Sequence, residues 1–423
     1  MNNVKKFFGN EVIRASLIVL FLTFIGNLFS YLFQFLSARM LGPSDFAIVA
    51  VITSLIAIFG IPSYAIQTVI AKNTTILNVK NKISKIKGLM ESSLKKTLAV
   101  ALLFFVIYSI LAVKVAVWLK IEYIYLFLTG LYIFGSFVYP VMTGIAQGMK
   151  KFSDFGFNFL INCMIKFVFG IGFIYLGFRV YGAIIGFLAG IFLAFLLFFY
   201  NLRDVIKNKT EGYDIKIFSQ ENLISLLAMV IFVLLFNLDV IFAKALFSPE
   251  ITGLYSVASL IGKIVLFVIS SIGTVMLPIS SEKHMIGGDT GRVLRKTLML
   301  SVVICLGALI ILTIFPRFII TLLFSQQYAS ISGIMPYICL AFCFLSFLNI
   351  YLLQAIATNK IKTVNVLILL ICLLIEIACF LIFADNIMNY TLAFMVSTFI
   401  TFLVNFFALK PKGKQNGNQK IKK

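Results

Sequence analysis

Residues 16–37 read SLIVLFLTFIGNLFSYLFQFLS, a run without a single charged residue in which bulky apolar side chains predominate. A bilayer core about 30 Å thick needs roughly 20 apolar residues per helix, so this run is long enough to cross a membrane. Lys5 and Lys6 precede the run, but no small-residue cleavage pattern follows it. We therefore interpret it as a retained first helix rather than a signal peptide.

Runs of the same kind fill the chain from end to end. Of its 423 residues, 61% are hydrophobic and only 12% are charged, whereas a soluble domain carries roughly a quarter charged residues. We predict helices at residues 16–37, 46–70, 97–118, 123–147, 155–177, 181–200, 222–243, 253–277, 297–324, 332–357, 363–384 and 389–409. The predicted fold class is an all-α integral membrane protein with twelve transmembrane helices.

The positive charges indicate the orientation of these helices. With both termini in the cytoplasm, 28 of the 36 Lys and Arg residues lie on the cytoplasmic side, six lie outside, and Lys166 and Lys263 fall within helices. The positive-inside rule predicts such a bias. The net charge of +21 therefore reflects topology, because the basic residues form no stripe with interleaved aromatics and indicate no nucleic-acid partner. The Lys-rich loops 71–96 and 201–221 are expected to face lipid headgroups.

The two halves of the chain share a short pattern. Residues 38–46 read ARMLGPSDF, and residues 243–250 read AKALFSPE, with Gly253-Leu254-Tyr255 following. Proline followed by an acid suits a helix start, because proline presets φ and the carboxylate meets the positive helix end. The repeat links helices six apart and predicts two halves related by an axis along the membrane normal, as in transporters. The predicted domains are a six-helix bundle at 1–203, a cytoplasmic linker at 204–221, a six-helix bundle at 222–409 and a basic cytoplasmic tail at 410–423.

Four segments of the chain resemble the polysaccharide transporter family. They are residues 38–46, the segment Gly148-Met149-Lys150-Lys151-Phe152, Asn237-Leu238-Asp239 leading to Gly253-Leu254-Tyr255, and Leu277-Pro278. The family belongs to the multidrug/oligosaccharidyl-lipid/polysaccharide (MOP) flippase superfamily and includes O-antigen and capsule repeat-unit flippases. The resemblance extends over nearly the whole chain, although Ala47 stands where the family commonly has Gly. It implies a MATE-like MOP fold, with two six-helix bundles around a central cavity, in the cell (inner) membrane.

The resemblance also implies a function. Its members move a polyprenyl-diphosphate-linked oligosaccharide from the cytoplasmic to the outer leaflet by alternating access, for surface polysaccharide biosynthesis. The implied partners are this lipid-linked substrate, membrane lipids, and the polysaccharide polymerase and chain-length machinery. No cofactor is expected beyond coupling to a sodium or proton gradient.

Polar residues recur at helical spacing inside several predicted helices, as a corridor for a sugar headgroup requires. The clearest stripes are Thr23, Asn27, Ser30, Gln34 and Ser37 in residues 16–37, and Asp154, Asn158, Asn162 and Lys166 around residues 155–177. Residues 46–70 and 253–277 carry further seams. We predict that Asn27, Gln34, Gln67 and Asn162 line the cavity. The alternative is that such seams only hold helices together.

Two lysines lie deep in predicted helices. A charge at bilayer depth costs roughly 2.5–3.5 kcal/mol, so Lys166 and Lys263 should each face a partner or a wet cavity. We predict that Lys263 binds the diphosphate, since its helix lines the cavity in the resembled fold; the alternative is that it neutralises a carboxylate. For Lys166, a phosphate and a carboxylate partner both remain open. Arg14 and Arg39 are further candidates for headgroup binding, although Arg14 is equally explained as a positive-inside anchor.

Acidic residues are rarer inside the helices. Glu376, deep in residues 363–384, and Asp239, near the outer end of residues 222–243, are candidates for coupling to an ion gradient. The alternative for each is a structural ion pair or a helix cap, and for Asp239 the structural role is favoured.

Other classes of protein fit less well. The only histidine, His284, has no HExxH or GxSxG motif near it, and the six cysteines fall in apolar runs without metal-ligand or disulfide spacing. We predict neither an enzyme nor a metal protein. The main alternative is a multidrug or organic-cation antiporter of the same superfamily, which would favour carboxylates and aromatics in its cavity. Two deep lysines against one comparably deep acid, Glu376, favour an anionic substrate.

Overall fold

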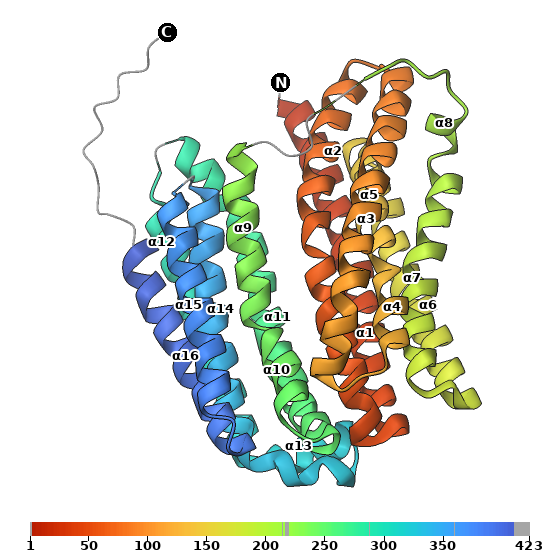
Figure 1. The fold of residues 1–423 in the computed structure, drawn as a ribbon. Coiled ribbons are helices and arrows are strands. Elements are labelled where there is room, and N and C mark those ends of the chain that lie inside the picture. The colour runs from red at the N-terminus through yellow and green to blue at the C-terminus, as the bar shows by residue number, and fades with distance from the viewer. Residues whose placement is uncertain (1, 214, 216–219, 287, 359, 410–423) are drawn as a thin grey trace. The chain divides into compact units, whose positions relative to one another are not determined.

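The structure, a computed structural model, describes residues 2–213, 215, 220–286, 288–358 and 360–409, with side chains at 18–213, 215, 224–277, 279–286, 288–358 and 360–408. All regular elements of the described chain are helical, which confirms the predicted all-α class (Figure 1). In chain order they are α1 (Asn2–Phe59), α2 (Ile61–Val79), α3 (Ile83–Leu119), α4 (Tyr123–Gly130), α5 (Tyr132–Gly148), α6 (Phe152–Phe173), η1 (Ile174–Phe178), α7 (Arg179–Asn201), α8 (Arg203–Ile206), α9 (Gln220–Leu235), α10 (Leu238–Leu246), α11 (Pro249–Met285), α12 (Thr290–Ile314), α13 (Pro316–Leu323), η2 (Gln326–Ile334), α14 (Met335–Ala357), α15 (Thr363–Ile382) and α16 (Ile387–Leu409).

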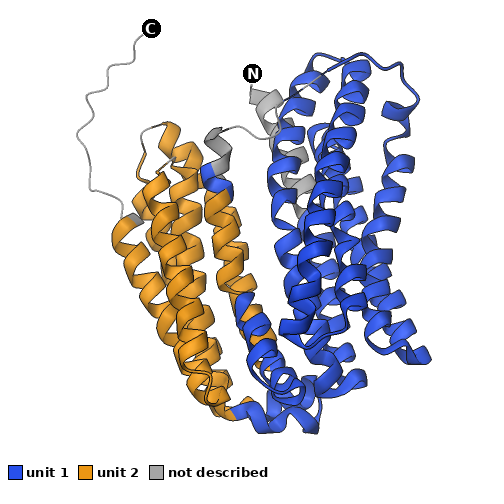
Figure 2. Cartoon of the chain, viewed as in Figure 1, with its two compact units in different colours: residues 1–226, 237–257, 317–332 blue, residues 227–236, 258–316, 333–423 orange. Residues whose placement is uncertain are grey.

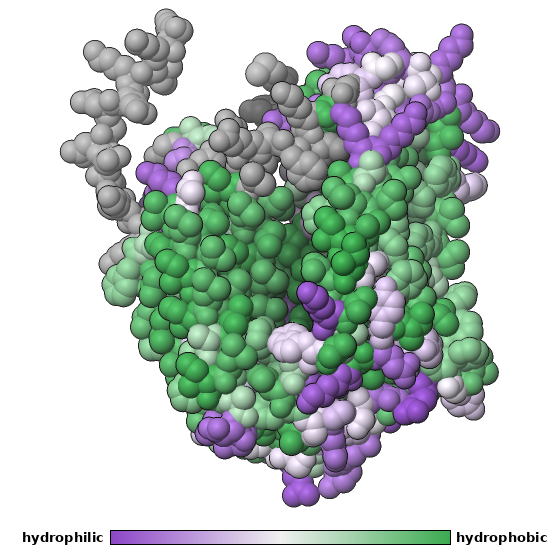
Figure 3. Space-filling view, viewed as in Figure 1, coloured by the Kyte–Doolittle hydropathy of each residue, from purple (hydrophilic) through white to green (hydrophobic). Residues whose placement is uncertain are grey.

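Most of these helices are built to cross a membrane. Within the described residues, nine helical segments are long and apolar enough to do so, or ten if the bent pair Ile224–Leu235 and Leu238–Leu246 forms one span. Hydrophobic residues cover the long sides of the helices on the face drawn in Figure 3, and hydrophilic residues gather mainly toward helix ends. The chain is therefore a multi-pass membrane protein.

Two of the nine segments are interrupted near their middle. Ile18–Val79 has 62 residues and Phe152–Asn201 has 50, whereas a straight helix of one membrane span is about 30 Å long. Gly42 has φ 72° and Gly177 has φ 91°, a backbone region that glycine adopts without steric cost, so the helical course breaks at both points. Arg179 donates to Asp45 at 2.6 Å and thereby joins the two interrupted regions.

The prediction that residues 71–96 form a loop is wrong. α2 continues to Val79, and α3 begins at Ile83 after a short turn in which Asn81 has φ 52°. α3 has 37 residues and is about 55 Å long, far more than the roughly 30 Å of a bilayer core. The lysines of this region lie on a helix that buries its other side, including Ile86 and Leu89, so polarity alone did not indicate a loop.

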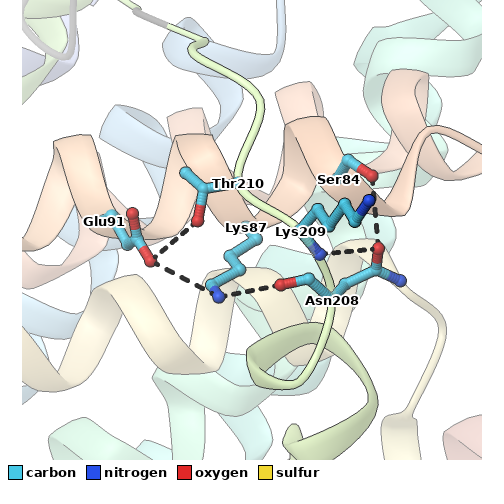
Figure 4. Close-up of polar contacts among 6 residues, drawn as sticks. All are labelled: Ser84, Lys87, Glu91, Asn208, Lys209 and Thr210. Atoms are coloured by element: carbon cyan, nitrogen blue, oxygen red, sulfur yellow. Dashed lines mark hydrogen bonds and ion pairs between the residues drawn. The ribbon is translucent and has the colours of Figure 1, made fainter.

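A strap, defined here as residues 207–213, lies along the first turns of α3 (Figure 4). Lys87 Nζ donates to the carbonyl oxygen of Asn208 at 2.8 Å, and Ser84 Oγ lies 3.2 Å from Asn208 Oδ1. Thr210 donates to Glu91 at 3.2 Å. These bonds fix the strap to the helix at three points.

The chain forms two compact units (Figure 2). Unit 1 comprises residues 1–226, 237–257 and 317–332, and in it α6 packs against α1 and α7 while α2 packs against α5. Unit 2 comprises residues 227–236, 258–316 and 333–423, and in it α14 packs against α12 and α16. The predicted bundles at 1–203 and 222–409 remain a prediction.

Candidate functional site

The candidate site lies in unit 1, where α1, α6 and α7 pack together. Helix α7 approaches α6 very closely at Gly186: a Cβ atom there would lie 2.6 Å from Gly170 Cα and 2.7 Å from the carbonyl oxygen of Lys166. Only glycine permits this approach, as in other tightly packed membrane helices. The contact fixes the stretch of α6 backbone that carries Lys166.

The ammonium of Lys166 is held by one hydroxyl and two aromatic faces. Nζ donates to Ser30 Oγ on α1 at 2.8 Å, and it lies 5.7 Å and 5.5 Å from the ring centroids of Phe33 and Phe187. The two rings are themselves T-shaped to each other, with centroids 5.3 Å apart. Aromatic faces attract a cation and carry no formal charge, so they stabilise the ammonium without neutralising it.

Lys166 has no acidic partner in the described part of the chain. It takes part in none of the ion pairs found there, and its side chain is half-buried rather than sealed. The carboxylate alternative left open by the sequence is therefore not realised among these residues.

The polar residues of α1 contact two different partners, one on α6 and one within α1 itself. Ser30 accepts from Lys166, whereas Gln34 is buried and its Nε2 lies 3.0 Å from Thr53 Oγ1 on the far side of the Gly42 break. Asn27, one turn before Ser30, is exposed. Gln34 thus joins the two arms of α1, and Asn27 lies one turn from Ser30.

The remaining predicted cavity residues mostly connect helices. Gln67 on α2 lies 3.2 Å from Gln147 on α5, amide to amide. Asn162, one turn before Lys166, is half-buried, and its Oδ1 would lie 3.1 Å from a Cβ atom at Gly190 of α7. Asn162 therefore lies one turn from Lys166 on the same helix, whereas Gln34 and Gln67 contact other partners.

The two arginine candidates both lie in α1. Arg39 is exposed, and its guanidinium donates to the carbonyl oxygen of Leu322 on α13. Next to it, the Tyr328 hydroxyl donates to the carbonyl oxygen of Ala38 at 2.8 Å. Arg14 lies in α1, but its side chain is outside the described residues.

The other deep charges are buried. In unit 2, Lys263 on α11 is 9% exposed and Glu376 on α15 is fully buried, with Cys372 and Cys379 one turn away on either side. In unit 1, Asp239 on α10 is fully buried and accepts a 3.4 Å hydrogen bond from the Tyr255 hydroxyl.

Two features of unit 1 were not predicted from the sequence. Phe33 and Phe187 were indistinguishable there from the other phenylalanines of a chain that contains 46. Lys244 was counted among the outer-side cations, yet it is only 1% exposed. Its position between two alanines, Ala243 and Ala245, was the one available sign that it could be enclosed.

The sequence was compared with models of protein families and with curated proteins. A family model described as polysaccharide biosynthesis protein matches residues 12–284. The comparison with curated proteins gave no match.

Solved structures with the same fold are transporters and flippases. An inward-facing multidrug resistance MATE family transporter of the MOP superfamily aligns with TM-score 0.71 and 13% identity over 91% of this chain and 96% of its own. The lipid II flippase MurJ, in an inward closed conformation, aligns with TM-score 0.69 and 16% identity over 93% and 87%. A MOP superfamily transporter from Pyrococcus furiosus, described as having a binding pocket of reversed polarity that suggests a different function, aligns with TM-score 0.61 and 15% identity over 94% of both chains.

Proposed function

Because the chain belongs to the polysaccharide biosynthesis protein family, we propose that it is a flippase for a polyprenyl-diphosphate-linked oligosaccharide. It moves this repeat unit from the cytoplasmic to the outer leaflet of the cell (inner) membrane by alternating access, for a surface polysaccharide of the O-antigen or capsule type. The observation that carries the proposal is the ammonium of Lys166, which is held at a three-helix seam without an acidic partner among the described residues.

The electrostatics of this site favour an anionic ligand. In a low-dielectric slab, a positive charge that is not neutralised by the protein attracts a diphosphate strongly. Ser30 accepts one of the three ammonium hydrogens, which leaves the others for phosphate oxygens in charge-assisted bonds. A site for an organic cation would instead need a carboxylate here, and none pairs with Lys166 in the described chain.

The breaks at Gly42 and Gly177 support a topology of twelve spans with both termini in the cytoplasm. Dividing the two long apolar segments at Gly42 and Gly177, and counting the bent pair as one span, is consistent with twelve spans. An even number of spans leaves both termini on one side, and the distribution of Lys and Arg favours the cytoplasm.

Further residues complete the proposed mechanism. Lys263 is the second deep cation and is proposed to meet the diphosphate, with Arg39 and Arg14 as peripheral contacts to the headgroup. Glu376 is proposed to couple transport to a sodium or proton gradient, since buried acids in membrane helices commonly serve ion pathways. For Asp239, which accepts a hydrogen bond from Tyr255, the proposed role is structural. The polymerase and chain-length machinery of the same pathway are proposed partners.

Deleting the gene tests the substrate class. Lipid-linked repeat units should accumulate on the cytoplasmic leaflet, surface polysaccharide should be lost, and efflux of cationic dyes should stay unchanged. A plasmid copy of the wild-type gene should restore the surface glycan, and an empty plasmid should not. Normal surface glycan combined with reduced dye efflux would instead support the organic-cation antiporter.

A further inference from the structure

The strap lies in the chain that joins the two halves of the sequence, and its backbone contacts α3 directly. A Cβ atom at Gly88 would lie 1.9 Å from the carbonyl oxygen of Glu211, so only glycine permits this approach. The backbone N–H of Glu211 donates to the carbonyl oxygen of Ser84 at 3.1 Å. The strap therefore has a backbone contact with α3 in addition to the side-chain bonds of Lys87 and Thr210 (Figure 4).

The anchored chain continues past the strap to Ile215. The Tyr213 hydroxyl donates to Asn73 Oδ1 on α2 at 3.4 Å, and Lys96 Nζ on α3 donates to the carbonyl oxygen of Ile215 at 3.3 Å. The side chains of Tyr213 and Ile215 also pack against the buried apolar cluster that α2, α3 and α5 share. Polar and apolar contacts thus hold this part of the chain on unit 1.

This anchoring shortens the free chain that leads to α9. The helix before the strap, α8, ends at Ile206, and α9 begins at Gln220 and leads from unit 1 into unit 2. An extended chain spans at most about 3.6 Å per residue, so the connection from Ile206 to Gln220 could span roughly 50 Å. From Ile215 to Gln220 it spans at most about 18 Å. Docking of the strap therefore reduces the reach of this connection almost three-fold.

We propose that the strap is a tether, which holds the chain between the two halves on α3 and limits how far the start of α9 can move away from α3 during the transport cycle. Alternating access requires the helices of one half to move against those of the other. A tether of fixed length sets an upper limit to this movement. The limit follows from chain length, so it rests on alternating access and not on the identity of the proposed substrate.

Two glycine variants separate a docked strap from a released one. Gly88→Ala places a methyl group against the Glu211 carbonyl, whereas Gly212→Ala adds the same group to the strap itself, where nothing lies within 4 Å. Limited trypsin digestion of the purified full-length protein reports the state of the strap, because Lys207 and Lys209 are exposed but lie in chain that is bonded to α3. Cleavage there should be at least ten-fold faster in Gly88→Ala than in the wild type, and Gly212→Ala should match the wild type.

The reach itself is measured as the distance between two spin labels. Labelled cysteines replace Lys82, immediately before α3, and Asn222, in the first turn of α9, in a background without native cysteines. Double electron–electron resonance then gives the range of distances between the labels. The wild type and Gly212→Ala should share the same longest distance, and Gly88→Ala should populate distances longer by at least about 10 Å.

A lengthened connection keeps the test valid if Gly88→Ala fails to fold. Insertion of eight Gly and Ser residues after Ile215 adds up to about 29 Å of chain and leaves the anchoring contacts in place. This variant should show the longer distances while its strap resists trypsin as the wild type does. The proposal is overturned if trypsin cuts the wild type and Gly88→Ala at the same rate, or if neither the released strap nor the insertion extends the longest distance.

None of these measurements involves transport, so the tether and the flippase can fail separately. A deletion strain with normal surface glycan would refute the flippase and leave the tether standing. Distances that do not respond to the insertion or to Gly88→Ala would refute the tether and leave the flippase standing.

Discussion

Replacing Lys166 by Met removes the ammonium and keeps an unbranched side chain at the seam of α1, α6 and α7. The loss includes a charged hydrogen bond to Ser30, about 1.5–3 kcal/mol, and two cation–aromatic contacts of about 0.5–1 kcal/mol each. The gain includes relief of the burial of a charge, roughly 2.5–3.5 kcal/mol, and sulfur contacts of about 0.3–1.5 kcal/mol with Phe33 and Phe187. These terms nearly cancel, so the free energy of unfolding should change by less than about 2 kcal/mol.

Transport should respond much more strongly than stability. A charge-assisted contact with phosphate of about 1.5–3 kcal/mol corresponds to a loss of roughly 10- to 150-fold in the transport rate. Lys166→Arg should keep partial activity, because the charge matters here more than its geometry. The assay measures surface glycan, protein abundance in the membrane and thermal unfolding in detergent for the same variants.

Two patterns of results would refute the reasoning. If Lys166 were half of a structural ion pair, its removal would strand a carboxylate at a cost of about 3–5 kcal/mol, and Lys166→Met would misfold or disappear from the membrane. A stable Lys166→Met protein with normal transport would equally remove Lys166 from the substrate path. Lys114→Met, at an exposed position, controls for the general effect of losing one lysine.

Three further predictions concern topology, packing and coupling. In a background without native cysteines, a cysteine at Ser44 should react with an impermeant maleimide outside intact cells and one at Asn208 should not; the reverse pattern would contradict the cytoplasmic termini. Gly186→Ala should destabilise the protein by about 1–3 kcal/mol in detergent, because its Cβ would collide with α6 backbone, whereas Gly172→Ala, with nothing within 4 Å, should be neutral. Glu376→Gln should leave protein abundance unchanged and make transport in vesicles insensitive to an imposed proton or sodium gradient; wild-type gradient dependence would exclude Glu376 from coupling.

The class of fold could be predicted from the sequence, because the hydropathy and length of each apolar run depend only on the residues of that run. An uncharged run such as residues 16–37 can make all its backbone hydrogen bonds within itself in lipid only as a helix. The spacing of its individual side chains was therefore not needed to predict the helix. Hydropathy does not predict the helices at residues 71–96, because there an amphipathic helix continues outside the apolar run. A threshold on hydropathy detects where a span can lie but not where a helix ends.

The candidate site was only half predictable, because its partners come from distant parts of the chain. The four-residue spacing of Asn158, Asn162 and Lys166 indicated a common helix face, yet Asn158 bonds Tyr139 at 3.2 Å while Lys166 reaches Ser30. Spacing along one helix shows which residues share a face, but it does not show which neighbouring helix each of them contacts. Lys244 shows the same limit, since its burial depends on α10 packing against other helices.

The hairpin of α2 and α3 also matters for structure determination. Membrane proteins without a sizeable domain in water give electron cryomicroscopy few features for aligning particle images. Here α3 runs without interruption from Ile83 into its apolar stretch, and the strap is bonded to its first turns through Lys87 and Asn208. A rigid helical fusion partner grafted at Asn81 would extend both helices directly. Because each added residue turns a helix by about 100° and lengthens it by about 1.5 Å, the junction length sets where the fused partner points.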